Sequence, residues 1–275
     1  MEKTKKNKIK ILAIQMESVI GDVNLNVSTV ENLLSANLQN SDIDFVFLPE
    51  VWTVGWHCPS FTNCAENIED AISISMLKTI AKKYNVNIIG GSFIEKKDDK
   101  LFNTCPVINR AGELICKYNK NHLFSYYGDS ENQYITKGDN PVMVELEGIK
   151  IGLTICYDIR FPEIYRAYRK AGADILVNMA AWPKSRKIHW DSLTTARAVE
   201  NQSYFVALTQ TGLLEDGSEN LGHSMIIDYS GNIIDEITEK EGAIFAEIDL
   251  NLMYEFRKKC TVLNDIKDSY EVIKK

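Results

Sequence analysis

Apolar runs alternate along the chain with stretches in which apolar residues recur at helical spacing. In the first half, runs typical of buried strands lie at 9–14, 44–48 and 86–94. Stretches with helical spacing lie between them, at 24–38 and 69–84. A charged turn at 96–100 and two further runs, 102–108 and 113–118, predict hairpin strands. The first half is therefore predicted to run strand, helix, strand, helix, strand and then hairpins.

The second half repeats this order. Strands are predicted at 150–155, 174–179 and 204–209, and helices at 161–171 and 188–201. On the second of these helices, Leu193, Ala196 and Val199 are expected to face inward. Three hairpin strands follow, at 224–228, 233–237 and 243–248. The chain thus carries two similar half-units.

Strands that alternate with helices form sheets covered on one face by helices. Because no linker separates the half-units, we expect them to share one core. We therefore predict an α/β fold of the four-layer α-β-β-α sandwich type, internally pseudo-duplicated. It would form a single domain over residues 1–275 with its core at about 9–270. The loop 121–140 has no clear periodicity, and loops of about 20 residues in compact domains are usually functional or disordered.

Composition narrows the functional class. Hydrophobic residues make up 45% of the chain, which excludes intrinsic disorder. The 31 Lys and Arg against 38 Asp and Glu give a net charge of −7, which argues against nucleic-acid and anionic-membrane partners. No stretch approaches the roughly 20 apolar residues of a membrane span, and the basic start is not followed by a signal-like apolar run. We expect a cytoplasmic protein.

The six cysteines show no C-x2–4-C spacing, and the chain has four histidines. This composition favours reduced thiols and predicts no metal site. One cysteine is placed differently, because Cys156 ends the strand 150–155 just before a helix. Ligand sites in α/β folds gather at such strand ends. A packing cysteine is the plainer reading of the same position.

Other candidates occupy comparable places. Glu50 ends the strand 44–48, and a carboxylate held beside a thiol can act as a general base. Lys120 lies just past the strand 113–118, and Glu131 lies in the long loop; alone, each would be a surface residue. His122 offers a Cys/His pair of protease type, but in papain-like proteases the cysteine precedes the histidine.

Taken in order, three features resemble the nitrilase, or carbon–nitrogen hydrolase, superfamily. They are Glu50 after Phe-Leu-Pro, the segment 118–124 and the segment 155–163. The resemblance extends over roughly residues 9–270 and implies a catalytic triad of Glu50, Lys120 and Cys156. It places a second active-site glutamate at Glu131. It also implies a homodimer and chemistry without a metal or an organic cofactor.

The implied chemistry is hydrolysis of a small-molecule amide through a thioester. Glu50 would take the thiol proton, and Lys120 with the backbone N–H of Tyr157 would stabilise the oxyanion. The Lys120 ammonium is expected to lower the pKa of the Cys156 thiol.

The sequence resembles one branch of the superfamily more closely than the others. The segments 181–183, 189–193, 196–202 and 222–224 resemble omega-amidases and their bacterial relatives, which hydrolyse 2-oxoglutaramate and 2-oxosuccinamate. The carboxylate of such a substrate would need a cation, for which Arg160, Lys184 and Arg186 are candidates. Two alternatives stay open: an amidohydrolase for N-carbamoyl amino acids or another small amide, and a catalytically silent binding or scaffold protein.

Overall fold

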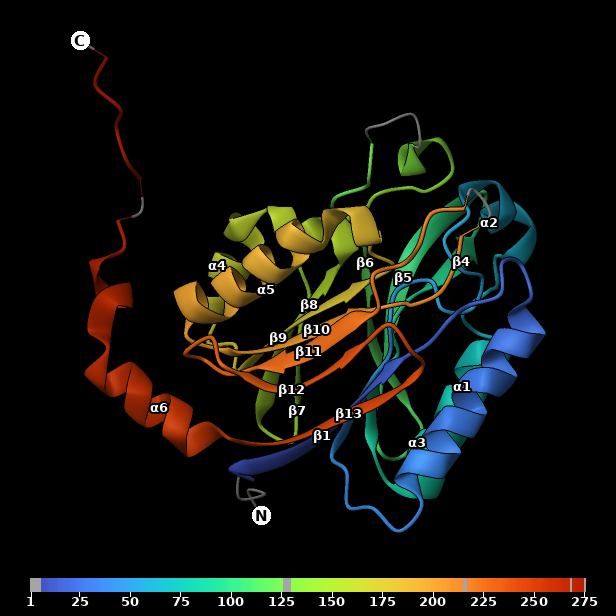
Figure 1. Ribbon diagram of the computed structural model, residues 1–275, viewed down its shortest axis with the longest axis horizontal. Helices are drawn as coiled ribbons and strands as arrows, with labels where there is room; N and C mark the ends of the chain where they lie inside the picture. The colour runs from blue at the N-terminus through green and yellow to red at the C-terminus, as the bar shows by residue number, and fades with distance from the viewer. Residues whose placement is uncertain (1–5, 126–129, 215–216, 268, 275) are drawn as a thin grey trace.

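Two mixed β-sheets pack face to face in the computed structural model, with helices outside each sheet (Figure 1). The structure describes residues 6–125, 130–214, 217–267 and 269–274. The predicted four-layer α-β-β-α arrangement is confirmed. None of the helices in these ranges is long and apolar enough to cross a membrane.

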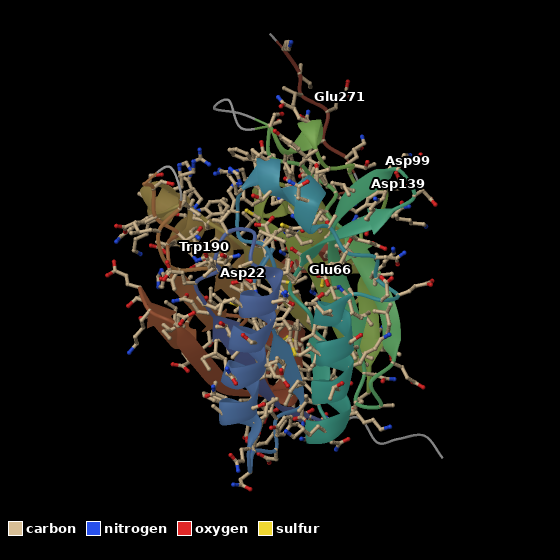
Figure 2. The ribbon with its side chains drawn as sticks, turned by 90° about the vertical axis from the view of Figure 1, so that its right-hand side faces the viewer. Asp22, Glu66, Asp99, Asp139, Trp190 and Glu271 are labelled. Carbon is tan, nitrogen blue, oxygen red and sulfur yellow. The ribbon has the colours of Figure 1, made fainter. Side chains whose placement is uncertain are left out.

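The first sheet has the strand order β13-β1-β2-β3-β5-β4, and β6 pairs with β5. Its strands are β1 (Lys8–Gln15), β2 (Phe45–Phe47), β3 (Asn87–Ile89), β4 (Phe93–Lys97), β5 (Lys100–Ile108), β6 (Leu114–Asn119) and β13 (Gly242–Asp249). Helices α1 (Val23–Leu38) and α3 (Ile72–Tyr84) lie side by side on its outer face (Figure 2). Helix α1 begins at Asp22, whose carboxylate accepts a hydrogen bond from the backbone N–H of Leu25.

The second sheet has the order β12-β11-β10-β9-β8-β7. Its strands are β7 (Met143–Leu146), β8 (Ile149–Ile155), β9 (Ile175–Ala180), β10 (Tyr204–Thr209), β11 (His223–Ile227) and β12 (Ile233–Thr238). Helices α4 (Pro162–Lys170) and α5 (Lys187–Asn201) cover it (Figure 1). The three central strands β8, β9 and β10 run parallel, and β9 and β10 are buried along their whole length, as strands covered on both faces must be.

Strand β1 shows how the layers are built from sequence. Ile9, Ile11 and Ala13 belong to the core between the two sheets, whereas Leu12 and Ile14 belong to the cluster beneath α1 and α3. Successive side chains of a strand point to opposite faces, so apolar residues at alternating positions of one strand can pack into both layers.

Some elements differ from the expectation. The run 86–94 is interrupted at Gly90 and Gly91, so that β3 and β4 are separate strands. Gly91 has φ +63°, and a Cβ there would lie 2.1 Å from the carbonyl oxygen of Pro49. The third hairpin strand, β13, leaves the second half-unit and pairs antiparallel with β1.

The buried face of α5 also differs from the expectation. Leu193 is half-buried and packs against the core as predicted, and Ala196 is half-buried, but Val199 is 47% exposed. Trp190, Thr194 and Arg197 are the buried residues of this face. Two helices, α2 (Cys58–Cys64) and α6 (Leu250–Lys259), and the strand β7 were not predicted from the apolar pattern. Short 3-10 helices η1 (Glu131–Gln133), η2 (Cys156–Arg160), η3 (Lys184–Arg186) and η4 (Thr261–Asp265) complete the described elements.

Candidate active site

Four residues singled out from the sequence meet in the interior. Glu50 comes three residues after β2, Lys120 directly follows β6, Cys156 directly follows β8, and Glu131 begins η1 in the long loop. Glu50, Lys120 and Glu131 are completely buried, and Cys156 is 8% exposed. The structure thus brings the predicted nucleophile, base, cation and second acid together.

The Lys120 ammonium lies between two carboxylates. Its Nζ donates to Glu50 Oε1 at 2.8 Å and to Glu131 Oε2 at 2.8 Å. Backbone N–H groups hold the same acids: that of Ala181 donates to Glu50 Oε2 at 2.8 Å, and that of Phe124 to Glu131 Oε2 at 3.0 Å. Buried charges are tolerated when they are paired and hydrogen-bonded in this way.

The electrostatics of this cluster follow from burial and pairing. Burial alone would lower the pKa of Lys120, but Glu131, Glu50 and Cys156 raise it well above the ordinary value, so the amine is an ammonium. Burial raises the pKa of Glu50, and Glu131 adds to this rise, while Lys120 opposes it. The cluster therefore combines a fixed positive charge with a carboxylate that binds a proton more readily than a free glutamate does.

Cys156 lies at a sharp turn between β8 and η2. Its φ of +44° is uncommon for a residue with a Cβ. The side chain of Asn178 donates to the Cys156 carbonyl oxygen at 3.3 Å. The next residue, Tyr157, whose backbone N–H was the expected oxyanion donor, lies in the first turn of η2.

The thiol does not have the expected low pKa. Burial raises the pKa of Cys156 well above its ordinary value, and Glu50 raises it further, whereas the opposing effect of Lys120 is smaller. Lys120 lowers the pKa of the thiol, as expected, but burial and Glu50 outweigh this effect, so the net pKa is raised. A neutral thiol needs a base at the moment of reaction, and Glu50 is in contact with it.

Asp158 joins the turn that carries the cysteine to the segment that carries the lysine. Its Oδ2 accepts from the backbone N–H of Ile155 at 2.9 Å and from the Tyr118 hydroxyl at 2.6 Å. Its Oδ1 accepts from the backbone N–H of His122 at 3.0 Å. The His122 Nδ1 lies 2.7 Å from Asp158 Oδ1, and its ring stacks on Phe161 at 3.8 Å between centroids. The His122 imidazole therefore contacts Asp158, which argues against a catalytic pair of Cys156 and His122.

Gly138 explains how the loop can close over the lysine. Its backbone N–H donates to the carbonyl oxygen of Lys120 at 2.8 Å. A Cβ on Gly138 would lie 2.1 Å from the carbonyl oxygen of Asn119. Only glycine permits this approach, which brings the loop with Glu131 against the end of β6.

Aromatic rings form the wall beside the charged cluster. The Lys120 Nζ lies 5.1 Å from the centroid of the Trp56 ring. Trp56 contacts Phe124 edge to face at 6.4 Å, and Phe124 contacts Tyr157 in the same way at 5.8 Å. The three rings are half-buried, and apolar groups beside buried charges lower the local polarity, which strengthens their electrostatic interactions.

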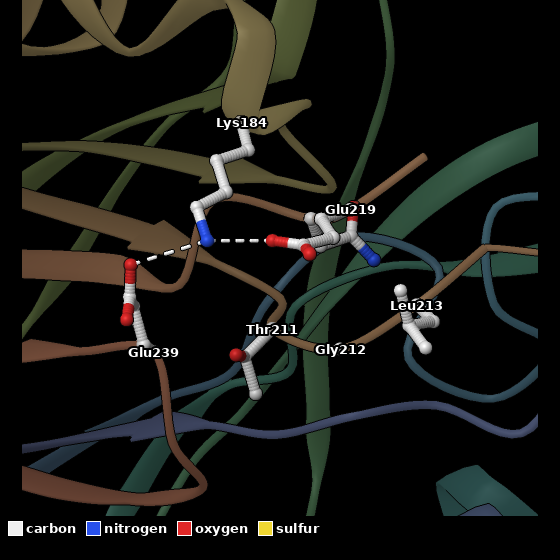
Figure 3. A pocket seen from close by; sticks show the side chains of 7 residues that line it. Lys184, Thr211, Gly212, Leu213, Glu219 and Glu239 are labelled. Atoms are coloured by element: carbon white, nitrogen blue, oxygen red, sulfur yellow. Dashed lines mark hydrogen bonds and ion pairs between the residues drawn. The ribbon is translucent and has the colours of Figure 1, made fainter. Parts of the chain in front are cut away.

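The three cations proposed for a substrate carboxylate have different surroundings. Lys184 forms ion pairs with Glu219 and Glu239 beside a cavity of about 200 Å³ (Figure 3). The guanidinium of Arg186 lies 5.3 Å from the Phe124 ring centroid.

Arg160, the third candidate, lies near His189, with Nη2 3.4 Å from the His189 Nδ1. Its guanidinium lies 5.8 Å from the ring centroid of Tyr157 and 5.1 Å from that of Trp182, and its buried Nε has no hydrogen-bond partner. Among the described residues Arg160 forms no ion pair.

Several site residues were not predicted. Asn103, Asp158, Asn178 and the backbone of Ala181 all contact the predicted residues. Asp158 lies within the cysteine motif, so its position carried a signal. The six cysteines are free, and among the described residues no group of three His, Cys, Asp or Glu side chains could hold a metal ion.

Comparisons with known proteins show the family and the fold of the chain. A family model described as carbon-nitrogen hydrolase matches residues 10–258. The chain is 37% identical over 262 residues to a 2-oxoglutaramate amidase of Bacillus subtilis strain 168, covering 94% of this chain and 98% of that protein. It is 33% identical over 272 residues to the chloroplastic omega-amidase of Arabidopsis thaliana, covering 93% and 72% respectively. The crystal structure of Saccharomyces cerevisiae Nit3, a member of branch 10 of the nitrilase superfamily, matches with a TM-score of 0.86 at 28% identity, covering 93% of this chain and 95% of Nit3.

Proposed function

The chain belongs to the carbon–nitrogen hydrolase family and is an amidase, and from this premise we propose that it releases ammonia from the terminal amide of 2-oxoglutaramate or 2-oxosuccinamate. The observation that carries the chemistry is the fully buried Lys120 ammonium, held between Glu50 and Glu131 beside the Cys156 thiol. The similarity to amidases named for 2-oxoglutaramate supports the substrate.

In the first step, Glu50 acts as a general base. It takes the Cys156 proton while the sulfur forms a bond to the amide carbon, whose carbonyl electrons move to the oxygen. Because the pKa of the thiol is raised by burial, proton removal and bond formation must be coupled. The raised pKa of Glu50 suits it to hold the proton for the next step.

Lys120 and the Tyr157 backbone N–H are proposed to stabilise the oxyanion. The ammonium already lies in a water-poor site, so it does not need to reorganise when negative charge develops. Loss of one such donor typically raises the barrier by about 3 kcal/mol. Glu131 keeps the ammonium in place and supplies a second balancing charge.

The intermediate then collapses. The carbon–nitrogen bond breaks, Glu50 returns its proton to the nitrogen, and ammonia leaves a thioester on Cys156. Water gives a proton to Glu50 and adds to the thioester carbon, and the sulfur leaves as a thiol when the proton returns to it. The products are a carboxylic acid, which then ionises in water, and ammonia, and no external redox partner is required.

Arg160 is proposed to bind the substrate carboxylate. Its guanidinium contacts the rings of Tyr157 and Trp182, and its Nε has a hydrogen bond to give. A planar guanidinium matches a carboxylate with two parallel N–H bonds. This favours a substrate that has an anionic group in addition to its amide.

Ammonia release by the purified protein tests the proposal. The substrates are 2-oxoglutaramate, N-carbamoyl-β-alanine and glutamine, and Cys156→Ala is the control. Release from 2-oxoglutaramate that is absent in the variant supports both the chemistry and the substrate. Release from N-carbamoyl-β-alanine alone would retain the chemistry and reject the substrate. No release from any of the three would return weight to a binding or scaffold role.

A further inference from the structure

Asn103 contacts the three charged residues of the site, Glu50, Glu131 and Lys120. It lies on β5 and is completely buried. Its Nδ2 donates to Glu50 Oε1 at 3.0 Å and to Glu131 Oε1 at 3.2 Å, so each of its two N–H bonds points to one carboxylate. Its backbone carbonyl oxygen accepts from the backbone N–H of Lys120 at 2.9 Å.

The other end of the same amide indicates that this placement is imposed by the acids. Asn103 Oδ1 is buried and has no hydrogen-bond partner among the described residues. Turning the amide over would direct that oxygen at two carboxylates, which would repel it. A buried polar atom without a partner needs an explanation, and the two donated bonds supply it.

The bonds also distinguish the two oxygens of Glu50. Oε1 accepts from both Lys120 Nζ and Asn103 Nδ2, so both of its lone pairs are occupied. Oε2 accepts from the Ala181 N–H and keeps one lone pair. The basic position of Glu50 is therefore Oε2.

We propose that Asn103 is a positioning residue for the amide hydrolysis: it fixes Glu50 and Glu131 relative to Lys120, and it directs the Cys156 proton to Glu50 Oε2. This inference rests on the proposed roles of Glu50 and Cys156. Asn103 touches neither the sulfur nor the substrate, and it acts through the two carboxylates.

The proposal has a consequence for pH dependence. Glu50 is faced by Lys120, Glu131 and Cys156, which come from three different segments. Asn103 adds two neutral donors that favour the ionised carboxylates. Without the donor to its Oε1, Glu50 binds a proton more tightly. The acidic limb of the kcat/KM profile, where the base becomes protonated, must then move to higher pH.

The test replaces Asn103 by leucine, which has a similar volume and no donor. The expected result is a loss of kcat on the order of tenfold or more, since a bond to a charged group is removed twice. KM should change less than threefold, and the acidic limb should move to higher pH. The matched control is Asn87→Leu, at another buried asparagine whose side chain donates to the Asp44 carbonyl oxygen. It should lower stability and leave the profile in place.

A second variant and a second readout keep the two hypotheses separate. If Asn103→Leu does not fold, Asn103→Ser removes the amide without adding volume and should move the limb in the same direction. Alkylation of Cys156 by iodoacetamide, followed on its peptide by mass spectrometry across pH, needs no substrate. Its acidic limb should move upward in the Asn103 variants even if the wild type releases no ammonia.

Two results would overturn the role of Asn103. One is an Asn103→Leu protein whose kcat stays within threefold of wild type and whose acidic limb does not move in either the ammonia-release or the alkylation profile. The other is an equal shift caused by Asn87→Leu, because that would indicate general loosening of the fold. Absence of ammonia release by the wild type, with the alkylation shift present, would instead reject the proposed substrate and retain Asn103.

Discussion

Replacing Lys120 by methionine removes a buried positive charge while keeping the length of the side chain. Glu50 and Glu131 would then face each other in the interior without the ammonium that now lies 2.8 Å from an oxygen of each. Both carboxylates are completely buried, so water cannot replace the lost partner. The variant should therefore lose stability as well as activity.

The magnitude follows from the cost of an unpaired buried charge. Breaking a buried ion pair by removing one partner typically costs about 3–5 kcal/mol. In the variant, binding of one proton by the two facing carboxylates would reduce this loss of stability. Such binding is favoured because a neighbouring like charge and burial both raise a carboxyl pKa. We expect a loss of about 3 kcal/mol in the free energy of unfolding at pH 8.

The pH dependence has a definite sign. In the variant, the pKa of the Glu50 carboxyl in the folded state lies above its unfolded value of about 4.3, because burial and Glu131 raise it and Lys120 no longer opposes them. Such a group contributes stability that is fully present below the unfolded pKa and is lost as the pH rises through the folded pKa. The deficit relative to wild type should therefore be larger at pH 8 than at pH 5.

Urea unfolding of four proteins measures these effects: wild type, Lys120→Met, Glu131→Gln and the double variant. The double variant removes one carboxylate together with the ammonium, so it should regain about 1 kcal/mol or more over the sum of the single losses. Ammonia release should stay abolished in it, because the oxyanion still lacks its cation. Lys184→Met, at an exposed ion pair, is the stability control and should cost about 0–1 kcal/mol.

The reasoning would be refuted by additive losses, or by a Lys120→Met deficit that does not depend on pH. Either result would mean that the two carboxylates do not interact through the lysine. Recovery of turnover in the double variant would remove Lys120 from the chemical step.

Three further outcomes are expected. Cys156→Ala should abolish ammonia release and keep a cooperative urea transition, and measurable turnover in it would rule out the thioester route. Arg160→Met should raise KM for 2-oxoglutaramate about 10–100-fold, which corresponds to the loss of a hydrogen bond between charged groups, and should change KM for a neutral amide less than threefold. Lys184→Met should leave both KM values unchanged. Equal effects of the two variants would reject Arg160 as the carboxylate ligand. At pH 7 the Cys156 thiol should react with iodoacetamide more slowly than free cysteine, because burial raises its pKa. A faster reaction would contradict the raised pKa.

The sequence was sufficient to locate the charged centre. Glu50, Lys120 and Cys156 each follow a recognisable apolar run, and the resemblance of their segments to one family joined them into a single site. The strands before them belong to both sheets, β2 and β6 to the first and β8 to the second. Asn103 could not be found in this way. Its role depends on two acids that lie 53 and 28 positions away in the chain, and only the folded structure brings them to its amide.

The fold shows the same division. Apolar periodicity located most strands, but on α5 it placed the exposed Val199 inside and missed the buried Trp190, Thr194 and Arg197 of the inner face. That face is anchored by hydrogen bonds: Trp190 Nε1 donates to the His223 carbonyl oxygen at 2.7 Å, and Arg197 donates to the carbonyl oxygen of Ile159. Hydropathy alone cannot detect such bonds. The break between β3 and β4 similarly depends on the approach of Gly91 to a backbone carbonyl from another segment.

The pairing of β1 with β13 has a consequence for synthesis of the chain. The register joins Lys8 to Asp249 and Gln15 to Gly242, so about 230 residues must be made before β1 gains this neighbour. At about 5–20 residues per second, this edge of the nascent sheet stays open for roughly 10–50 s on the ribosome. An apolar strand with unpaired backbone groups is prone to pair with other chains during that time. Premature termination anywhere before β13 should therefore yield aggregating fragments, and a chaperone that shields the emerging N-terminus should raise the yield of folded protein.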